Sequence, residues 1–251
     1  MFLSPELNVY KDIPSFFLCY EENQLVSFLG AFFPTEEEVE FNGFTHPAFR
    51  RQGYFSSLIG FALQTYQEHP FQRALFQREM QSETGYAYLN KRYPEIERTE
   101  YIMQLSKAHD TSREYVEGML ELVGSSNLKR AAQVMSNAFD ESLERSLEHL
   151  NYLLSQSDRK TFLYILGEEA IGILNAHMVE DTWMLHGVGI QKEHRNQGKG
   201  KDMLSIALPV LFCDAPIVSL EVDSYNIPAL SVYKKLGFVP TSQVDYHRLS
   251  L

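Results

Sequence analysis

Short apolar runs alternate with polar breaks along the chain, and their spacing predicts both strands and helices. The continuous runs 16–20 and 25–33 flank the polar segment 21–24, which is typical of two strands joined by a tight turn. Further strands are expected at 39–44, 74–76 and 101–105, and helices at 58–63 and 85–90.

A polar segment at 106–112 has no periodicity and predicts a linker. After it, a comparable order of elements begins again. The elements expected there are a strand within 115–122, a helix over 128–139 behind the N-cap residue Ser126, a helix over 142–154, a strand ending at Ile190, a helix from Met203 to Val210 and a strand over 217–222. The sequence therefore predicts two similar parts.

A constant offset of 145 residues relates these two parts. Identical residue types recur at this offset at motif positions, over about 85 residues, and the matching pairs are Arg50 and Arg195, Gly53 and Gly198, Tyr88 and Tyr233, and Tyr101 and Tyr246. One offset held over such a length indicates an internal duplication. The expected domains are 1–108 and 113–251. Because the counterpart of 113–160 would precede residue 1, the first copy is expected to lack two helices.

The segment from Arg195 to Lys201 lies between a predicted strand and a predicted helix and contains two glycines. Such a loop presents free backbone N–H groups at the positive end of a helix dipole, which favours an anion as ligand. Gly198 and Gly200 would let the backbone approach that ligand, and Arg195 would add a charge-assisted contact. A P-loop is excluded, because Asp202 stands where Ser or Thr is required.

Composition and charge exclude several classes of binding partner and indicate a cellular compartment. The formal net charge of −11, without a dense cluster of basic residues, argues against nucleic acid. The start of the chain lacks the pattern of a signal peptide, and the longest apolar stretch, 206–212, is too short to cross a bilayer, so no membrane contact is expected. Cys19 and Cys213 are the only cysteines, which suggests a reducing, cytoplasmic compartment. The histidines and cysteines form no HExxH or CxxC motif, so no metal is expected.

The second part resembles the GNAT superfamily of acetyl-CoA-dependent N-acetyltransferases. The residues that carry the resemblance are Arg195, Gly198 and Gly200 in the loop, then Asn226 and Ala229, and the segment Tyr233-Lys234-Lys235-Leu236-Gly237-Phe238. The resemblance covers 113–251 and reaches 16–106 only through the internal repeat. It implies an α+β protein with two GNAT-like domains, each a twisted mixed β-sheet flanked by helices, with the N-terminal copy truncated and degenerate.

The resemblance also implies roles for particular residues. The diphosphate of acetyl-CoA would be bound by Arg195, Asn196, Gln197, Gly198, Lys199, Gly200 and Lys201. Pantetheine and the thioester would meet the backbone of Val188, Gly189 and Ile190 as an added strand, and Asn226 would support the cofactor. The reaction would be attack of a small-molecule amine on the thioester. Tyr233, near the sulfur, would protonate the leaving thiolate as general acid.

No motif fixes the group that deprotonates the amine. His186 and Glu221 are the leading catalytic candidates, and His177 and Asp223 are the others. Each of them could equally be an ordinary strand residue. The oligomeric state and the identity of the acceptor stay open at this point.

The first copy carries Phe55 where the second has Gly200, and Arg92-Tyr93-Pro94 where the second has Leu-Gly-Phe. We expect this half to have lost acetyl-CoA turnover and to serve as a scaffold or substrate wall. Two other functions remain for the whole protein, namely a non-catalytic acyl-CoA-binding or sensing module and a regulator that acetylates proteins.

Overall fold

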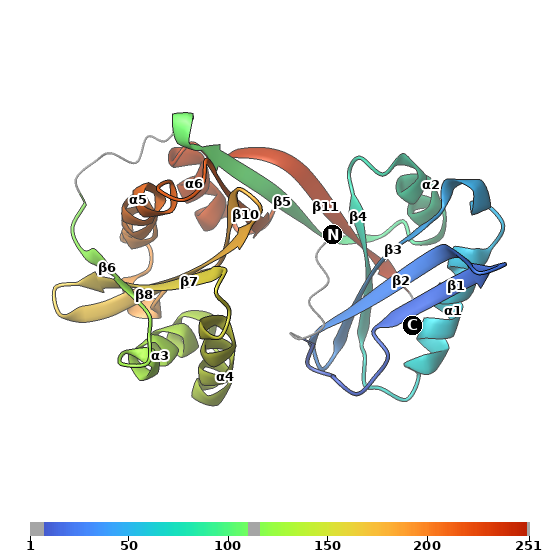
Figure 1. Ribbon diagram of the computed structural model, residues 1–251, viewed down its shortest axis with the longest axis horizontal. Coiled ribbons are helices and arrows are strands. Elements are labelled where there is room, and N and C mark those ends of the chain that lie inside the picture. The colour runs from blue at the N-terminus through green and yellow to red at the C-terminus, as the bar shows by residue number, and fades with distance from the viewer. Residues whose placement is uncertain (1–7, 110–115, 250–251) are drawn as a thin grey trace. The chain divides into compact units, whose positions relative to one another are not determined.

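The computed structural model describes residues 8–109 and 116–249. Its internal contacts divide the chain into two compact units, one of residues 1–100 with 243–251 and one of residues 101–242. Over the described residues, the hydrogen-bonding order of the strands is β1-β2-β3-β4-β11-β5-β10-β9-β8-β7-β6 (Figure 1). Each unit combines a mixed sheet with helices, which confirms the expected α+β class.

The first unit is built on a hairpin and two helices. Its elements are β1 (Phe16–Glu21), β2 (Gln24–Thr35), β3 (Glu38–Thr45), α1 (Tyr54–Thr65), β4 (Arg73–Glu79), α2 (Glu83–Arg92), the start of β5 (Ile96–Ser106) and the end of β11 (Val239–Leu249). Glu22 and Asn23 join β1 to β2 with positive φ at both residues, the turn geometry that matches strand twist. This confirms the expected hairpin.

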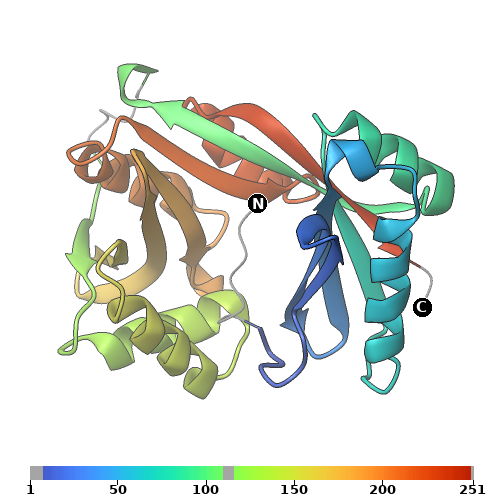
Figure 2. The same ribbon diagram turned by 45° about the vertical axis from the view of Figure 1, so that its right-hand side comes forward.

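Both helices of the first unit cover the same face of its sheet (Figure 2). Ile59 of α1 and Leu89 of α2 are buried in one apolar cluster with Val39 and Phe41 of β3. Because side chains alternate along a strand, Glu38, Glu40 and Asn42 point to the opposite face. The two helices that the first copy was expected to lack would belong to that face, and no helix from the described part of this unit covers it.

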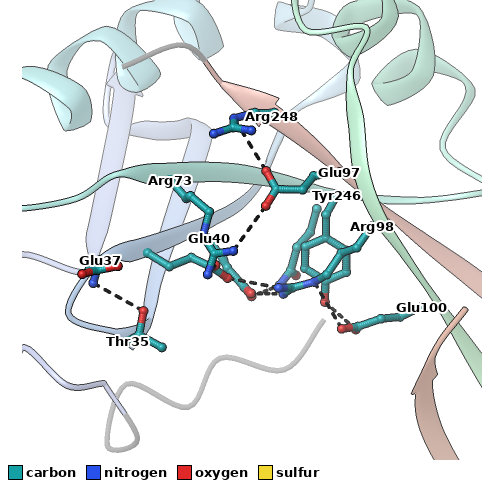
Figure 3. Close-up of polar contacts among 11 residues, drawn as sticks. Thr35, Glu37, Glu40, Arg73, Glu97, Arg98, Glu100, Tyr246 and Arg248 are labelled. Carbon is teal, nitrogen blue, oxygen red and sulfur yellow. Dashed lines mark hydrogen bonds and ion pairs between the residues drawn. The ribbon is translucent and has the colours of Figure 1, made fainter. Parts of the chain in front are cut away.

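A network of charged side chains occupies the uncovered face (Figure 3). Arg98 of β5 forms ion pairs with the buried carboxylates Glu38, at 3.1 Å, and Glu40, and its guanidinium lies 4.0 Å from the centre of the Tyr246 ring. The Tyr246 hydroxyl donates to Glu100 at 2.6 Å. Burial raises the pKa of Glu40 to about 7, although Arg98 acts in the opposite direction. Glu40 therefore changes charge near neutral pH.

The second unit contains two helices without a counterpart in the described part of the first. Its elements are β6 (Met119–Leu122), α3 (Leu128–Phe139), α4 (Leu143–Leu154), β7 (Arg159–Leu166), β8 (Glu169–Val179), β9 (Thr182–Ile190), α5 (Lys199–Leu211), β10 (Ile217–Asp223) and α6 (Ile227–Lys235), with the remaining parts of β5 and β11. Among the described residues, the second unit thus has four α-helices and the first has two.

Two separate apolar clusters cover the two faces of this second sheet. Leu150 of α4 packs with Leu163 and Ile173, whereas Met203 and Leu204 of α5 pack with residues from the other side of the strands. Figure 1 shows α3 and α4 on one side of β7 and β8, and α5 and α6 on the other. The strands are buried on both faces.

The last strand of each predicted copy is hydrogen-bonded within the other unit. β11 pairs antiparallel with β4 from Val244 opposite Glu79 to Leu249 opposite Ala74, and Asp245 forms a buried ion pair with Arg78. β5 lies next to β10 in the strand order. Each unit is therefore assembled from both halves of the chain. The expected domains, 1–108 and 113–251, follow the sequence repeat and differ from these two units. These domain limits stay a prediction.

The prediction that an irregular linker begins at residue 106 was wrong. β5 continues to Ser106, and Lys107–His109 form a short 3₁₀ turn. The Lys107 amide donates to the Pro216 carbonyl at 2.9 Å, and this contact with a distant segment extends the strand. Residues 110–112, and the start of the strand expected within 115–122, lie outside the described residues. The helix expected over 128–139 has these bounds, but its N-cap is Asn127 and not Ser126.

We expect Glu40→Gln to flatten the pH dependence of stability in the first unit. A carboxyl group whose pKa is raised by folding stabilises the fold at low pH, and this contribution is lost as the pH rises from about 4.5 through about 7. Hydrogen exchange of β3 and β4 amides between pH 5 and 8, corrected for intrinsic exchange, measures the effect. The exposed Glu36→Gln is the control. Equal pH dependence in wild type and Glu40→Gln would contradict the assignment.

Candidate functional site

In the second unit β9 and β10 run side by side for only part of their length. Their parallel pairing extends from Thr182 opposite Ile217 to Leu185 opposite Leu220. β9 then continues to Ile190 and β10 to Asp223, and over the described residues no further pair joins them. The backbone edges that face each other beyond Leu185 are available to an extended ligand, which could bind as an added strand.

A β-bulge marks the point where β9 leaves β10. His186 lies opposite Asn175 of β8, and Gly189 lies opposite Ile173, so two residues of β9 oppose one of β8 between these pairs. Gly187 has a φ of 56°, and a Cβ there would overlap the Asn175 side-chain nitrogen. Only glycine satisfies both conditions.

The predicted anion loop follows β9 and ends at α5. Gly198 is the left-handed N-cap of the helix, and the first helical hydrogen bond runs from the Asp202 amide to the Gly198 carbonyl at 3.1 Å. The amides of Lys199 and Gly200 precede this bond, so they lack a partner within the helix and lie at its positive end. A Cβ at Gly200 would meet only Ile190, at 3.8 Å, so the approach to these amides is open.

Arg195 ties this loop to the strand and to α3. Its Nε donates to the Ile190 carbonyl at 3.0 Å and its Nη2 to the Ala138 carbonyl at 2.6 Å. The Lys192 amide donates to the Asn137 side chain at 2.9 Å. Arg195 thus positions the loop, a role that the sequence did not predict, and its contact with an anion stays a prediction.

The other loop residues also shape the turn. Asn196 has a positive φ of 60°, and the Gln197 side chain donates to the Glu193 carbonyl at 2.9 Å. Lys199 forms an ion pair with Asp202 at 3.4 Å. These contacts hold the loop before any ligand binds. The expected contacts of these loop residues with a diphosphate stay a prediction.

The strand residues before the loop are constrained by α3. A Cβ at Gly189 would lie 2.7 Å from the Phe139 ring and 3.0 Å from the Ala138 side chain, so the helix can pack this closely only against glycine. Val188 packs against the apolar cluster on the other face. The backbone from Val188 to Ile190 is therefore fixed between two layers of side chains.

Tyr233 and Asn226 belong to α6. Asn226 is the N-cap, and its side-chain oxygen accepts from the Ala229 amide at 3.2 Å. Tyr233 is 7% exposed and its ring centroid lies 5.8 Å from that of Phe238. Burial raises the pKa of Tyr233 to about 12, so its phenol keeps the proton at neutral pH. It can donate a proton, as the proposed role requires.

The base candidates lie in different surroundings. Burial lowers the pKa of His186 to about 4, with Arg159 adding to the effect, so its imidazole is neutral at pH 7. His177 faces Asp158 at 3.4 Å, and burial lowers its pKa as well. Glu221 is exposed on β10, and Asp223 accepts from the Tyr225 amide at 2.7 Å. His186 stands directly before the bulge.

The internal repeat appears again in the loop geometry of the first unit. Arg50 Nε donates to the Thr45 carbonyl at 3.1 Å, as Arg195 does to the Ile190 carbonyl. Gly53 is a left-handed N-cap with a φ of 93°, and the Gln52 side chain donates to the Ala48 carbonyl at 3.2 Å, matching Gln197. Equivalent atoms make equivalent bonds at the offset of 145, so the duplication extends to the fold of both loops.

The first copy differs where a ligand would enter. Its β3 and β4 also diverge beyond the pair of Phe41 and Phe76, but no bulge interrupts β3 at Asn42 or Gly43. The Phe55 ring centroid lies 5.4 Å from those of Phe76 and Tyr88, and a Cβ at Gly43 would lie 2.9 Å from the Phe55 ring. An aromatic ring therefore contacts both diverging strands, where the second copy has Gly200.

Within 8–109 and 116–249, no group of three or more His, Cys, Asp or Glu side chains is arranged to hold a metal ion. In the same ranges no helix is long and apolar enough to cross a membrane.

Comparisons with known proteins point to a single family. Residues 128–238 match the family described as acetyltransferase (GNAT) family. Mycothiol acetyltransferase from Streptomyces scabiei (strain 87.22) is 36% identical over 81 residues, which cover 31% of this chain and 26% of that relative. The match thus spans about a quarter of the relative's length.

Two solved structures are similar over most of the chain. A GCN5-related N-acetyltransferase from Sphaerobacter thermophilus superposes with a TM-score of 0.73 at 17% identity, over 91% of this chain and 78% of that one. A tandem GNAT protein from the clavulanic acid biosynthesis pathway gives a TM-score of 0.71 at 15% identity, over 94% and 84%. At such identities the similarity shows the fold, which is the expected tandem GNAT arrangement.

We expect Gly187→Ala to lower the free energy of unfolding of the second unit by about 2–4 kcal/mol, because the new Cβ combines a strained positive φ with a contact to Asn175. Urea unfolding followed by the fluorescence of Trp183, the single tryptophan, measures this. Gly167→Ala is the matched control, since Gly167 also has a positive φ but nothing within 4 Å of the place a Cβ would take. Equal losses for both variants would show that the contact with Asn175 is unimportant.

Proposed function

We propose that this chain, whose residues 128–238 match the GNAT family of acetyltransferases, transfers an acetyl group from acetyl-CoA to the amine of a small molecule. The observation that carries the proposal is the divergence of β9 from β10 next to the open amides at the start of α5. A cofactor with an extended amide-containing arm and a diphosphate matches both features.

In the proposed complex, the diphosphate lies at the loop from Arg195 to Lys201 and the pantetheine amides pair with the backbone of Val188–Ile190. This places the thioester near the bulge at Gly187. Asn226 supports the cofactor indirectly, because it caps the helix that carries Tyr233. These assignments rest on the loop geometry and on the family match.

The proposed reaction needs one base and one acid. A neutral amine attacks the thioester carbonyl, the C–N bond forms and the C–S bond breaks, and the electron pair of that bond leaves with sulfur. Neutral His186 accepts a proton from the nitrogen, and Tyr233 donates its proton to the thiolate. His186 is favoured over Glu221 because it adjoins the bulge and has an unpaired buried ring nitrogen among the described residues.

We propose a single cofactor site per chain, in the second unit. In the first unit the Phe55 ring contacts both strands that would have to receive pantetheine. The first copy would then serve as scaffold.

Cys19 and Cys213 are both free thiols, which supports a reducing compartment such as the cytoplasm.

A non-catalytic acyl-CoA sensor is the alternative from another class, and a regulator that acetylates proteins is a third. Purified protein incubated with acetyl-CoA and a panel of small amines, with thiol release as readout, separates them. Cofactor binding without thiol release across the panel would favour the sensor. Release only with protein substrates would favour the third class.

We expect Gly198→Glu to abolish acetyl-CoA binding and Gly53→Glu to leave it unchanged. Both glycines are left-handed N-caps, and nothing lies within 4 Å of the place a Cβ would take, so both substitutions carry similar strain. Only at Gly198 would the new carboxylate repel the diphosphate. Calorimetry should give one site per wild-type chain. Loss of binding in Gly53→Glu alone would reverse the assignment of the active copy.

We expect Tyr233→Phe to reduce kcat by about 10²–10⁴-fold while the Kd for acetyl-CoA stays unchanged, because the phenyl ring retains the packing and only the acid is lost. Since the pKa of Tyr233 is about 12, the wild-type rate should show no loss from this group up to pH 9. Steady-state thiol release from pH 6 to 9 provides both measurements. A kcat within threefold of wild type would reduce Tyr233 to a packing residue.

A further inference from the structure

Three buried polar atoms lie on one face of three neighbouring strands in the second unit. They are Nε of Arg159 on β7, Nδ2 of Asn175 on β8 and Nε2 of His186 on β9, and none has a hydrogen-bond partner in the described part of the chain. Arg159 lies opposite His177 in the register, and Asn175 lies opposite His186. Because side chains alternate along a strand, all of these point to the face that α3 and α4 cover.

The orientation of the Asn175 amide is fixed by its neighbours. Its oxygen accepts from the Thr161 hydroxyl at 2.8 Å, and its nitrogen points to Gly187, where it leaves no room for a Cβ. Asn175 is 1% exposed. A buried donor without an acceptor costs about 1–3 kcal/mol, so an oxygen that reached Asn175 Nδ2 at the bulge would gain a hydrogen bond.

The cluster around these atoms has a cationic centre. Arg159 lies over the Tyr152 ring at 5.7 Å and contributes to lowering the pKa of His149, His177 and His186, in each case after burial. The imidazoles are therefore neutral and the guanidinium carries the charge. The acidic groups that act on the cluster are Asp158, which faces His177, and Glu141, which acts on His149. Nε of Arg159 has no partner among them.

We propose that this cluster, Arg159, Asn175 and His186, binds the acceptor and that the acceptor is an amine bearing a carboxylate. The inference rests on the proposed function. Arg159 binds the carboxylate, Asn175 donates to an acceptor oxygen near the bulge, and His186 accepts the proton of the amine. An arginine guanidinium is the side chain best suited to hold a carboxylate.

The spacing of the cluster limits the length of the acceptor. One strand, β8, separates Arg159 from His186, and their partners on β8 are two residues apart, so their backbones are about 12 Å apart at the usual strand spacing of about 4.8 Å and rise of about 3.4 Å per residue. Both side chains extend into this span. The remaining gap fits an amine and a carboxylate separated by a few bonds, as in a free amino acid.

The first copy lacks this cluster. In its register Gly30 lies opposite Asn42, at the place where the second copy has Asn175 opposite His186. The polar cluster and the open cofactor loop thus occur together in the second copy.

The test compares free amino acids with the carboxamides of the same amino acids, using full-length protein, acetyl-CoA and thiol release. Wild type should prefer the carboxylates by about 100-fold in kcat/KM. Arg159→Gln should lower kcat/KM for the carboxylates by about 100-fold, mostly through KM, and change that for the carboxamides by less than threefold. Arg159→Lys should recover part of the loss. Arg130→Gln, on the surface of the same unit, is the matched control.

Binding of acetyl-CoA by calorimetry and Trp183 fluorescence show whether each variant is folded. Acetylation of amines with no preference for carboxylates, or equal effects of Arg159→Gln on both sets, would overturn the inference and leave the proposed function intact. Cofactor binding without thiol release for any amine of either set would overturn both.

Discussion

The site in the second unit depends on one extra residue in β9. Without Gly187, β9 would keep its register with β8, and His186 could not face α4 while Ile190 lies close to Gly200. The bulge reverses the alternation of faces within the strand. In consequence, His186 before the bulge belongs to the cluster with Arg159 and Asn175. The backbone of Val188–Ile190, after the bulge, lies beside the loop that begins at Arg195.

The two copies form an internal comparison of what the bulge and the loop contribute. The arginine, with its Nε bond to the strand carbonyl, and the left-handed glycine are retained in the first copy, so they are requirements of the turn itself. The bulge and the open position at Gly200 occur only in the second copy. The features specific to the second copy are therefore those that the proposed cofactor site requires, and the shared ones belong to the turn.

The sequence predicted the features that depend on local chemistry. The hairpin and the glycine loop follow from apolar spacing and turn residues, whereas the tandem GNAT fold was implied by the family resemblance of the motif residues together with the internal repeat. The bulge at Gly187 did not, because it depends on the register between β8 and β9, and neither did the role of Arg195, because Ala138 lies far away in the chain. Asn175 offered a weak signal, as the one polar residue in the run from Ile171 to Ala176.

The exchange of final strands limits how such a protein can be shortened. Met103 and Leu105 of β5 are buried in the core that contains Met203 and Tyr233, although they belong to the first half of the chain. A deletion that removed the first copy would also remove a strand from the core of the second. Point substitutions in the first half can therefore change its loop, whereas loss of β5 would remove two buried side chains from the core of the second unit.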